Sequence, residues 1–298
     1  MKNHDQALGR AALFLATLIW GISFVLMDVT LTHMGAFFIL AIRFLGAAAV
    51  MLPFAARDFK KLDKRYLTSG VIMGLLLLAA YAFQTFGLAL TTPGKNAFLT
   101  AVYCIIVPFL YWAFRRKRPH AFNIAAAAIC IVGGGLISLD GSLRLGLGDG
   151  LTLVCGLVFA VHIVVTGAAV RNRSTVLVAM LQFAVAGALA LILALLFEPA
   201  PVNLSAETVW GLVFLTVVST ALCLFLQTFG QKHTPPAQAS VIMALEAVFG
   251  AAASVLFTGE VLTVKLTVGF MLTFAAVIIS ETKLSFFKAG WQQIRDSQ

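Results

Sequence analysis

Long apolar segments follow one another along almost the whole chain. Each is about as long as the ~20 residues that a helix needs to cross the hydrocarbon core of a bilayer. Runs such as 70–82 (GVIMGLLLLAAYA) lack the period-two alternation of a membrane β-barrel strand. The pattern predicts an all-α integral membrane protein with ten transmembrane helices, over residues 8–30, 35–56, 67–90, 96–115, 121–140, 149–170, 174–197, 207–230, 237–258 and 262–283.

Composition excludes the other broad classes. Hydrophobic residues make up 61% of the 298 residues and charged residues only 11%, whereas a soluble domain carries about 25% charged residues. Disordered chains are poor in apolar residues. The net charge of +9 does not indicate a nucleic-acid partner, because the basic residues lie in short loops rather than on one soluble face. The partner expected from composition is the lipid bilayer.

Lys and Arg are divided unequally between the two sides of the predicted bundle. With the N-terminus inside, 17 of the 21 fall on inner segments, 3 fall on outer loops, and Arg43 lies within a span. Basic residues favour the cytoplasmic side of a membrane. We therefore expect a multi-pass protein of the bacterial cytoplasmic (inner) membrane with both termini cytoplasmic.

The two halves of the chain resemble each other. The tetrapeptide QTFG at 84–87 returns at 227–230, a separation of 143 that also places Tyr103 on Glu246. Earlier in each half the separation is 139, which places Arg43 on Gln182. The separation increases from 139 to 143 along each half, which fits a longer loop in the second half.

This similarity predicts two five-helix repeats, over 1–144 and 145–285, followed by a cytoplasmic tail over 286–298. Because five is odd, the repeats must insert in opposite orientations. Inverted repeats are typical of transporters, in which two related halves can exchange roles as the gate on either side. An old duplication without a moving mechanism is the alternative.

Several short motifs occur in a fixed order along both halves of the chain. They are Trp20-Gly21, Arg43-Phe44, Ala97-Phe98-Leu99-Thr100 with Val107-Pro108, Gly148-Asp149-Gly150, Leu245-Glu246 with Val248-Phe249, and Gly259-Glu260. In order and spacing they resemble the EamA-type, ten-helix members of the drug/metabolite transporter (DMT) superfamily. The resemblance covers nearly the whole chain and departs from the family pattern at Ala247, where Pro is common. It implies two inverted five-helix repeats around a central cavity, and a secondary transporter that exports amino acids or related small metabolites by alternating access.

Two charged residues lie deep within the predicted spans, where polar groups usually face the bundle interior. Glu246 can bind an amine, carry a proton or form a structural ion pair. Arg43 prefers a carboxylate partner in forked geometry. Either the two charges hold opposite ends of a zwitterionic substrate, or Arg43 pairs with Glu246 or Asp28 to hold helices together.

His162 lies near the middle of the predicted span 149–170. Histidine titrates close to physiological pH, so His162 and Glu246 are the two candidates for proton coupling. A lone histidine in a membrane also serves as a hydrogen-bonding group between helices, and both interpretations stay open.

Polar and aromatic side chains of the first, third and fourth spans are candidates for a cavity lining. Gln84 and Tyr103 are expected at a similar depth, and Tyr81 lies about one turn from Gln84 on the same side. An amide beside amphipathic aromatic rings suits a small polar solute, although ordinary packing is the alternative. The expected substrate-binding residues are Trp20, Phe24, Arg43, Tyr81, Gln84, Tyr103, His162 and Glu246.

Glycines mark places where helices approach closely or bend. Gly70 and Gly74 form a GxxxG pair, which predicts a close helix contact. Helix hinges are the other use of an intramembrane glycine or proline, and the candidates are Gly21, Gly87, Pro108, Gly230 and Gly250.

Enzymatic function finds little support. Residues 146–149 spell GLGD, a motif of intramembrane aspartyl proteases, but no Tyr-Asp partner occurs in another span, and Asp149 is better explained as a helix cap. We expect no metal, because the cysteines (Cys104, Cys130, Cys155 and Cys223) form no CxxC pair and no HExxH helix is present. We likewise expect no cofactor and no catalytic residue, because no P-loop is present.

The partner expected from the repeat and its internal polar residues is a small-molecule substrate. Without a nucleotide site, the energy source must be a gradient or exchange. A flippase for lipid-linked sugars is the alternative within transport, but it would need a polar groove open to lipid. The sequence leaves the oligomeric state open.

Overall fold

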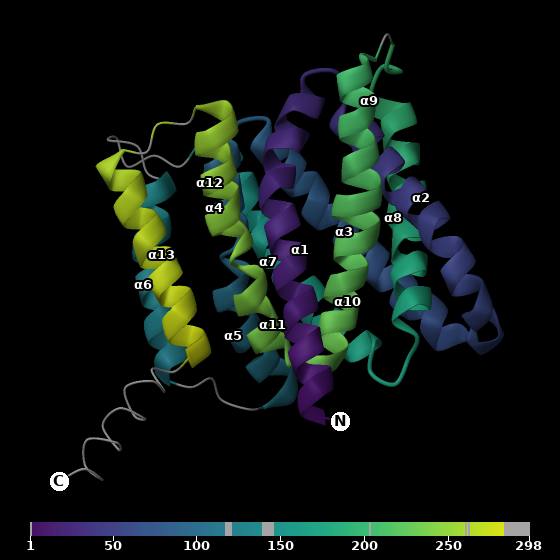
Figure 1. Cartoon of the computed structure of the whole chain (residues 1–298), viewed down its shortest axis with the longest axis horizontal. Coiled ribbons are helices and arrows are strands. Elements are labelled where there is room, and N and C mark those ends of the chain that lie inside the picture. The colour runs from purple at the N-terminus through teal and green to yellow at the C-terminus, as the bar shows by residue number, and fades with distance from the viewer. Residues whose placement is uncertain are drawn as a thin grey trace.

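The computed structural model describes residues 2–116, 121–138, 146–202, 204–259, 261 and 263–282 of the chain, and every regular element among them is a helix. The helices lie side by side in one bundle (Figure 1). In chain order they are α1 (Lys2–Leu31), α2 (Ala36–Ala55), the short 3-10 helix η1 (Ala56–Lys61), α3 (Lys64–Leu88), α4 (Pro93–Thr100), α5 (Tyr103–Arg115), α6 (Ala121–Ser138), α7 (Leu147–Ala169), α8 (Thr175–Phe197), α9 (Ala206–Val213), η2 (Phe214–Leu222), α10 (Cys223–His233), α11 (Pro236–Met243), α12 (Glu246–Thr258) and α13 (Val264–Thr282).

Eight helical segments of this described part are long and apolar enough to cross a membrane. Two further helices, α6 and α13, coincide with the remaining predicted spans, 121–140 and 262–283, and pack against each other on one side of the bundle (Figure 1). The eight segments are His4–Leu31, Ala36–Lys61, Lys64–Leu88, Pro93–Phe114, Leu147–Ala169, Thr175–Phe197, Ala206–His233 and Pro236–Thr258.

Polar side chains set the ends of several helices, because the first N–H groups of a helix lack partners within it. The carboxylate of Asp63 accepts a hydrogen bond from the Tyr66 N–H at 2.8 Å at the start of α3. At the start of α2 the acceptor comes from another helix. The two carboxylate oxygens of Glu198, which follows α8, accept from the N–H groups of Phe37 and Phe38 at 2.8 and 2.9 Å.

Two of the predicted spans are broken near their middle. The predicted spans 96–115 and 237–258 are present as Pro93–Phe114 and Pro236–Thr258, but each is interrupted: α4 ends at Thr100 before α5 begins at Tyr103, and α11 ends at Met243 before α12 begins at Glu246. At each break the N–H groups turn to acceptors three residues back, as in Cys104 N to Ala101 O and Ala247 N to Ala244 O. The two breaks lie at corresponding positions, 143 residues apart.

A further departure from regular helix lies in the eighth predicted span, 207–230. Residues Phe214–Leu222 form a π-helix, η2, between α9 and α10. The π-helix has i→i+5 hydrogen bonds, is rare, and occurs frequently at functional sites. The wider turn of η2 changes which side chains of the span formed by α9, η2 and α10 face the bundle interior.

Glycines lie where helices touch. A Cβ atom at Gly74 would lie 2.7 Å from Val185 Cβ and 2.9 Å from the Gln182 carbonyl oxygen, so α3 and α8 are in close contact as the GxxxG pair predicted. Gly87 of α3 likewise faces Gly148 of α7, and Gly230 of α10 faces Gly9 of α1. In this structure these glycines serve close packing rather than a visible bend.

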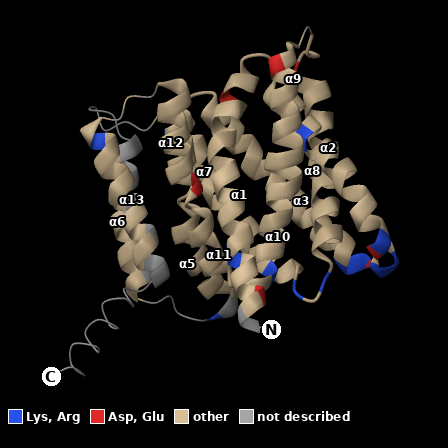
Figure 2. Cartoon of the chain, in the orientation of Figure 1, with Lys and Arg blue, Asp and Glu red and all other residues tan. Residues whose placement is uncertain are grey.

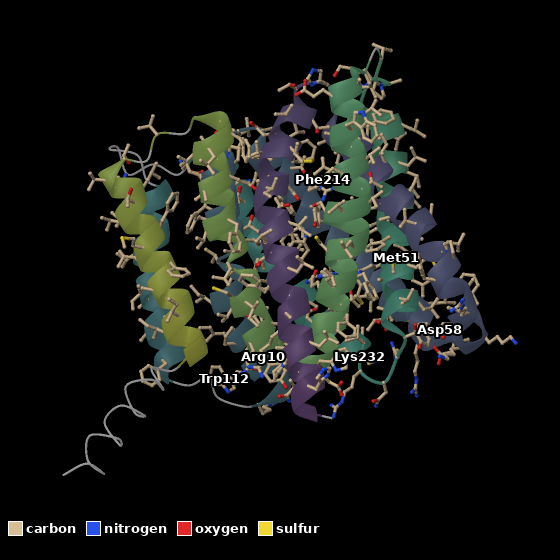
Figure 3. All side chains as sticks on the ribbon, in the orientation of Figure 1. Arg10, Met51, Asp58, Trp112, Phe214 and Lys232 are labelled. Carbon is tan, nitrogen blue, oxygen red and sulfur yellow. The ribbon has the colours of Figure 1, made fainter. Side chains whose placement is uncertain are left out.

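Charge is distributed unevenly along the bundle axis. Figure 2 shows most of the Lys and Arg at the end of the bundle where the N-terminus lies. Arg10 and Lys232 lie at this end together with Asp58, which pairs with Lys61 at 2.7 Å (Figure 3).

Candidate functional site

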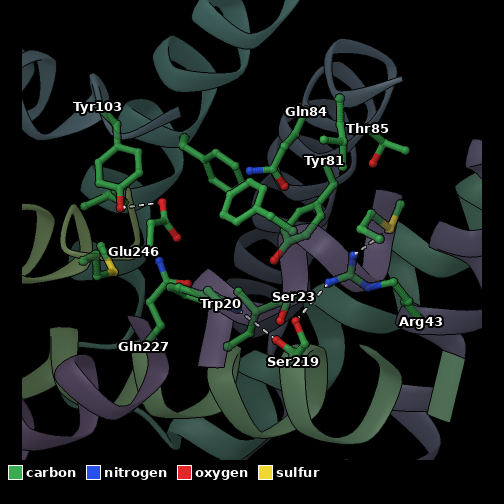
Figure 4. Close-up of a pocket in the computed structure, with 17 residues that line it drawn as sticks. Trp20, Ser23, Arg43, Tyr81, Gln84, Thr85, Tyr103, Ser219, Gln227 and Glu246 are labelled. Carbon is green, nitrogen blue, oxygen red and sulfur yellow. Dashed lines mark hydrogen bonds between the residues drawn. The ribbon is translucent and has the colours of Figure 1, made fainter. Parts of the chain in front are cut away.

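The central pocket lies inside the bundle, between helices of both halves of the chain (Figure 4). Its empty space is about 580 Å³, including the part open to the outside. Seven of the eight residues expected from the sequence line it. The lining residues are Trp20, Ser23, Phe24, Met27, Arg43, Tyr81, Gln84, Thr85, Leu88, Tyr103, Phe159, Ile163, Ser219, Leu224, Gln227, Met243 and Glu246.

The two helix breaks meet at one side of this pocket. Tyr103 is the first residue of α5 and Glu246 the first residue of α12. The Tyr103 hydroxyl donates a hydrogen bond to Glu246 Oε1 at 2.9 Å. Only 3% of Tyr103 and 6% of Glu246 are exposed. The breaks thus bring a carboxylate and a phenol together inside the bundle.

Arg43 of α2 lies at the other side of the pocket (Figure 4) and is 3% exposed. Its Nε donates to Thr220 Oγ1 at 3.0 Å, whereas its terminal nitrogens make only longer contacts, Nη2 to Ser219 Oγ at 3.5 Å and Nη1 to Met27 Sδ at 3.6 Å. The guanidinium carbon lies 4.9 Å from the centre of the Tyr81 ring, within the range of a cation–π interaction.

Neither structural ion pair considered from the sequence is present. Among the described residues the ion pairs are Lys61–Asp58 and Lys95–Asp149. Arg43 therefore contacts hydroxyls, a thioether and an aromatic face but no carboxylate. A buried charge without an ionic partner is costly, and this holds for Arg43 and Glu246 alike, since neither takes part in an ion pair with a described residue.

Trp20 and the π-helix residue Ser219 line the pocket between its Glu246 side and its Arg43 side (Figure 4). The Trp20 Nε1–H donates to the Ser219 carbonyl oxygen at 2.9 Å. This bond engages a backbone acceptor of η2 that would otherwise repel an anion. Trp20 thus has a polar role in addition to the apolar wall, shared with Phe24, that the sequence suggested.

Gln84 and Tyr81 reach the pocket from α3. Gln84 Nε2 donates to Thr100 Oγ1 at 3.3 Å, at the end of α4. The Tyr81 ring packs edge to face on Phe44 and Phe159, with ring centres 5.3 and 5.4 Å away.

His162 is the expected residue that the pocket lining does not include. One ring nitrogen, Nε2, lies 3.0 Å from Gln182 Oε1, and the side chain is 1% exposed. On α7 it is Phe159 and Ile163 that line the pocket, whereas His162 pairs with Gln182 of α8. The other nitrogen, Nδ1, has no hydrogen-bond partner among the described residues.

Some lining residues were missed by sequence reasoning. Ser23 and Met27 follow Trp20 at helical spacing, so that face of α1 could have been extended. Gln227 occupies the position equivalent to Gln84 in the repeat, which was a usable signal. Ser219 carries no such signal, because its place in the lining depends on η2.

Asp149 of the GLGD sequence lies in the first turn of α7 and bonds to side chains from the α3–α4 connection and the start of α4. Its carboxylate accepts from Thr91 Oγ1 at 3.0 Å and forms an ion pair with Lys95 Nζ at 3.2 Å. These contacts join the start of α7 to the α3–α4 connection. Groups of three or more His, Cys, Asp or Glu side chains that could hold a metal ion are absent from the described residues.

Known proteins place the chain in a family. The EamA-like transporter family matches twice, over residues 7–139 and 146–282. A protein of Archaeoglobus fulgidus described as "Uncharacterized transporter" is 28% identical over 270 residues, which are 90% of this chain and 84% of that protein. A solved structure titled "Crystal structure of protein" has a TM-score of 0.74 at 16% identity and covers 94% of this chain and 98% of its own, so it shares the fold. The chain is a multi-pass membrane protein and belongs to the EamA-like transporter family of the DMT superfamily.

Proposed function

We propose that this transporter exports a small metabolite that carries a carboxylate, an amino acid or a related compound, by alternating access. The observation that carries the proposal is Arg43, a buried guanidinium in the central pocket without a carboxylate partner. A substrate carboxylate would supply the forked partner that arginine favours. Binding would then relieve the cost of the unpaired charge.

Glu246 supports the choice of a zwitterion. It lies at the opposite side of the pocket from Arg43 (Figure 4) and is likewise outside the ion pairs of the described chain. A substrate ammonium group would pair with it, and between substrates the same carboxylate can carry a proton. Trp20, Phe24, Tyr81, Gln84 and Tyr103 complete the proposed binding site around the body of the substrate.

His162 has a different place in the proposal. Because it pairs with Gln182 outside the pocket lining, it is retained only as a second proton-coupling candidate.

The proposed architecture is ten spans in two inverted five-helix repeats, 1–144 and 145–285, with a tail over 286–298, so that α6 and α13 are the fifth and tenth spans. Paired contacts support it. Gly87 and Gly230 are related by the offset of 143 and Gly9 and Gly148 by the offset of 139. The contact of Gly87 with Gly148 thus corresponds to that of Gly230 with Gly9.

The two ends of the bundle differ, as alternating access requires. At the N-terminal end a second cavity with an empty space of about 1740 Å³ lies among residues such as Ser69, Tyr111 and Lys232. At the other end Asp149 is tied to Thr91 and Lys95. We propose that the N-terminal end faces the cytoplasm of a bacterial inner membrane, which its basic residues favour, and that the conformation is open inward and closed outward.

Flux through purified protein tests the proposal. Proteoliposomes loaded with one of the twenty standard L-amino acids should exchange it for the labelled form added outside. Arg43→Gln should reduce that exchange by about tenfold or more, since a hydrogen bond to a charged group is worth ~1.5–3 kcal/mol. Arg57→Gln, which removes an exposed arginine, is the matched control and should exchange like the wild type.

Two results would contradict the proposal. Exchange of no amino acid by a folded wild-type protein would exclude the substrate class. Undiminished exchange by Arg43→Gln would exclude Arg43 as the carboxylate partner. A parallel assay with a fluorescent lipid-linked sugar tests the flippase alternative, and its translocation by the wild type would replace amino-acid export.

A further inference from the structure

The π-helix η2 distinguishes the two halves of the pocket. Its counterpart in the first half, at 71–79 by the offset of 143, is regular helix within α3. Thr220 of η2 corresponds to Leu77 of α3, and Arg43 corresponds to Gln182. Arg43 and Thr220 therefore combine a cation with a hydroxyl group, whereas the equivalent residues, Gln182 and Leu77, carry an amide and an apolar side chain.

These differences have a visible effect on hydrogen bonding. The Arg43 Nε–H donates to Thr220 Oγ1 at 3.0 Å. Gln182 Nε2, in the equivalent half-site, has no hydrogen-bond partner among the described residues. Arg43 of α2 and the Thr220 hydroxyl of η2 therefore form a donor–acceptor pair. The equivalent residues, Gln182 and Leu77, form no such pair.

Thr220 holds one edge of the guanidinium only. The Thr220 hydroxyl donates its own hydrogen to the Leu215 carbonyl oxygen, five residues back, at 2.6 Å, which leaves its lone pairs for Arg43. Its side chain is completely buried, and it is not among the lining residues. With Nε fixed, the plane of the guanidinium is fixed as well.

The opposite edge of the guanidinium is left for a ligand. The hydrogen bonds of Nη1 and Nη2 are the long ones to Met27 Sδ and Ser219 Oγ, at 3.6 and 3.5 Å, and the Tyr81 ring lies beside the same guanidinium. Arginine has five N–H donors in a rigid fork that matches a carboxylate. Ser219 lines the pocket, and its hydroxyl lies beside this edge.

We propose that η2 builds a carboxylate half-site. Thr220 positions Arg43 so that Nη1 and Nη2 point to the substrate carboxylate, and the Ser219 hydroxyl contacts the same group. Trp20 contributes by engaging the Ser219 carbonyl oxygen, which would otherwise repel an anion. The inference rests on the proposed function and specifies which end of the substrate is recognised, and by which segment.

The test compares two threonines of the same π-helix. Thr220→Val removes the anchor of Arg43 at nearly constant shape. Thr216→Val is the matched control, because Thr216 Oγ1 is buried without a hydrogen-bond partner among the described residues. The readout is the KM for the best-exchanged standard L-amino acid and for its own carboxamide, which lacks the carboxylate charge.

The wild type should prefer the acid over the amide. In Thr220→Val the KM for the acid should rise by about tenfold, the usual effect of losing a hydrogen bond to a charged group, while the KM for the amide stays within about twofold. Thr220→Ser should restore the wild-type preference, and Ser219→Ala should weaken it. A structural role of Thr220 would change both substrates alike.

The outcomes distinguish the π-helix inference from the proposed amino-acid export on which it rests. In one outcome the folded wild type exchanges amino acids, and Thr220→Val prefers the acid over the amide as strongly as Thr216→Val does. The π-helix inference is then wrong, and amino-acid export stands. If the wild type exchanges none of the twenty amino acids, the proposed function fails and the half-site fails with it.

Discussion

Tyr103 and Glu246 are equivalent positions of the two halves of the chain, and they are hydrogen-bonded to each other. The phenol donates to Oε1 at 2.9 Å across the 143 residues that also separate the two QTFG segments. Each residue begins the second part of a broken helix. A movement that separates the starts of α5 and α12 would stretch or break this bond, so the proposed binding of substrate at Glu246 and a movement of the two halves would affect each other.

Replacing Glu246 by Gln tests that coupling. The amide oxygen still accepts the Tyr103 hydrogen bond, so the variant should insert and fold, while the charge for an ammonium group or a proton is lost. We expect Glu246→Gln to abolish exchange of L-amino acids in proteoliposomes. Tyr103→Phe keeps the charge and removes one donor to it, which is worth ~1.5–3 kcal/mol, and should slow exchange by about tenfold.

Gel filtration of detergent-solubilised protein is the control for folding in both variants. An Arg57→Gln sample processed in parallel gives the loss expected from reconstitution alone. Wild-type exchange by a well-folded Glu246→Gln protein would exclude Glu246 from both substrate binding and proton coupling.

The packing of α3 on α8 gives a prediction about stability. A Cβ atom at Gly74 would lie 2.7 Å from Val185 Cβ and 2.9 Å from a backbone oxygen of Gln182, which cannot move away easily. Overpacking of this kind costs ~1–3 kcal/mol. Gly74→Ala should therefore lower the midpoint of thermal unfolding in detergent.

Gly150→Ala is the matched control for this prediction. No atom lies within 4 Å of a Cβ atom at Gly150, in the first turn of α7. Alanine is a better helix former than glycine, so the midpoint should stay constant or rise. Equal effects of the two substitutions would mean that the α3–α8 contact is looser than it appears in the structure.

Hydropathy predicted the positions of the helices well, because the bilayer imposes a length on each apolar run. It could not predict their interruptions. The residues at 100–103 and 243–246 include no glycine and no proline, so no helix-breaking residue marks the breaks in the sequence. The π-helix is equally hidden, since a change of hydrogen-bond register leaves the apolar pattern intact.

Sequence reasoning has the same limit for the residues that it expected in the pocket lining. Intramembrane polar residues are few and usually face inward, so Arg43 and Glu246 were found from residue type alone. His162 was selected by the same rule but pairs with Gln182 outside the pocket lining. Composition identifies which residues are costly in lipid, whereas tertiary packing decides whether a pocket or another helix satisfies them.

The Lys95–Asp149 ion pair gives the last prediction, which concerns the end of the bundle proposed above to be closed outward. The pair joins the start of α4 to the start of α7 at 3.2 Å, with 19% of the Lys95 and 4% of the Asp149 side chain exposed. If it holds the outer end closed, Asp149→Asn should let that end open more often. Leu88, which lines the central pocket at the end of α3, reports on this opening when replaced by cysteine.

A membrane-impermeant maleimide added from outside should label Leu88→Cys about three- to tenfold faster when Asp149→Asn is also present, the range expected for losing a partly buried ion pair. The protein without Leu88→Cys measures background labelling of the native cysteines. Exchanging the two charges, Lys95→Asp with Asp149→Lys, re-forms the pair and should return the rate toward that of Leu88→Cys alone. A rate that does not respond to Asp149→Asn would mean that the carboxylate only caps α7 and that packing alone, at contacts such as Gly87 with Gly148, keeps the outer end closed.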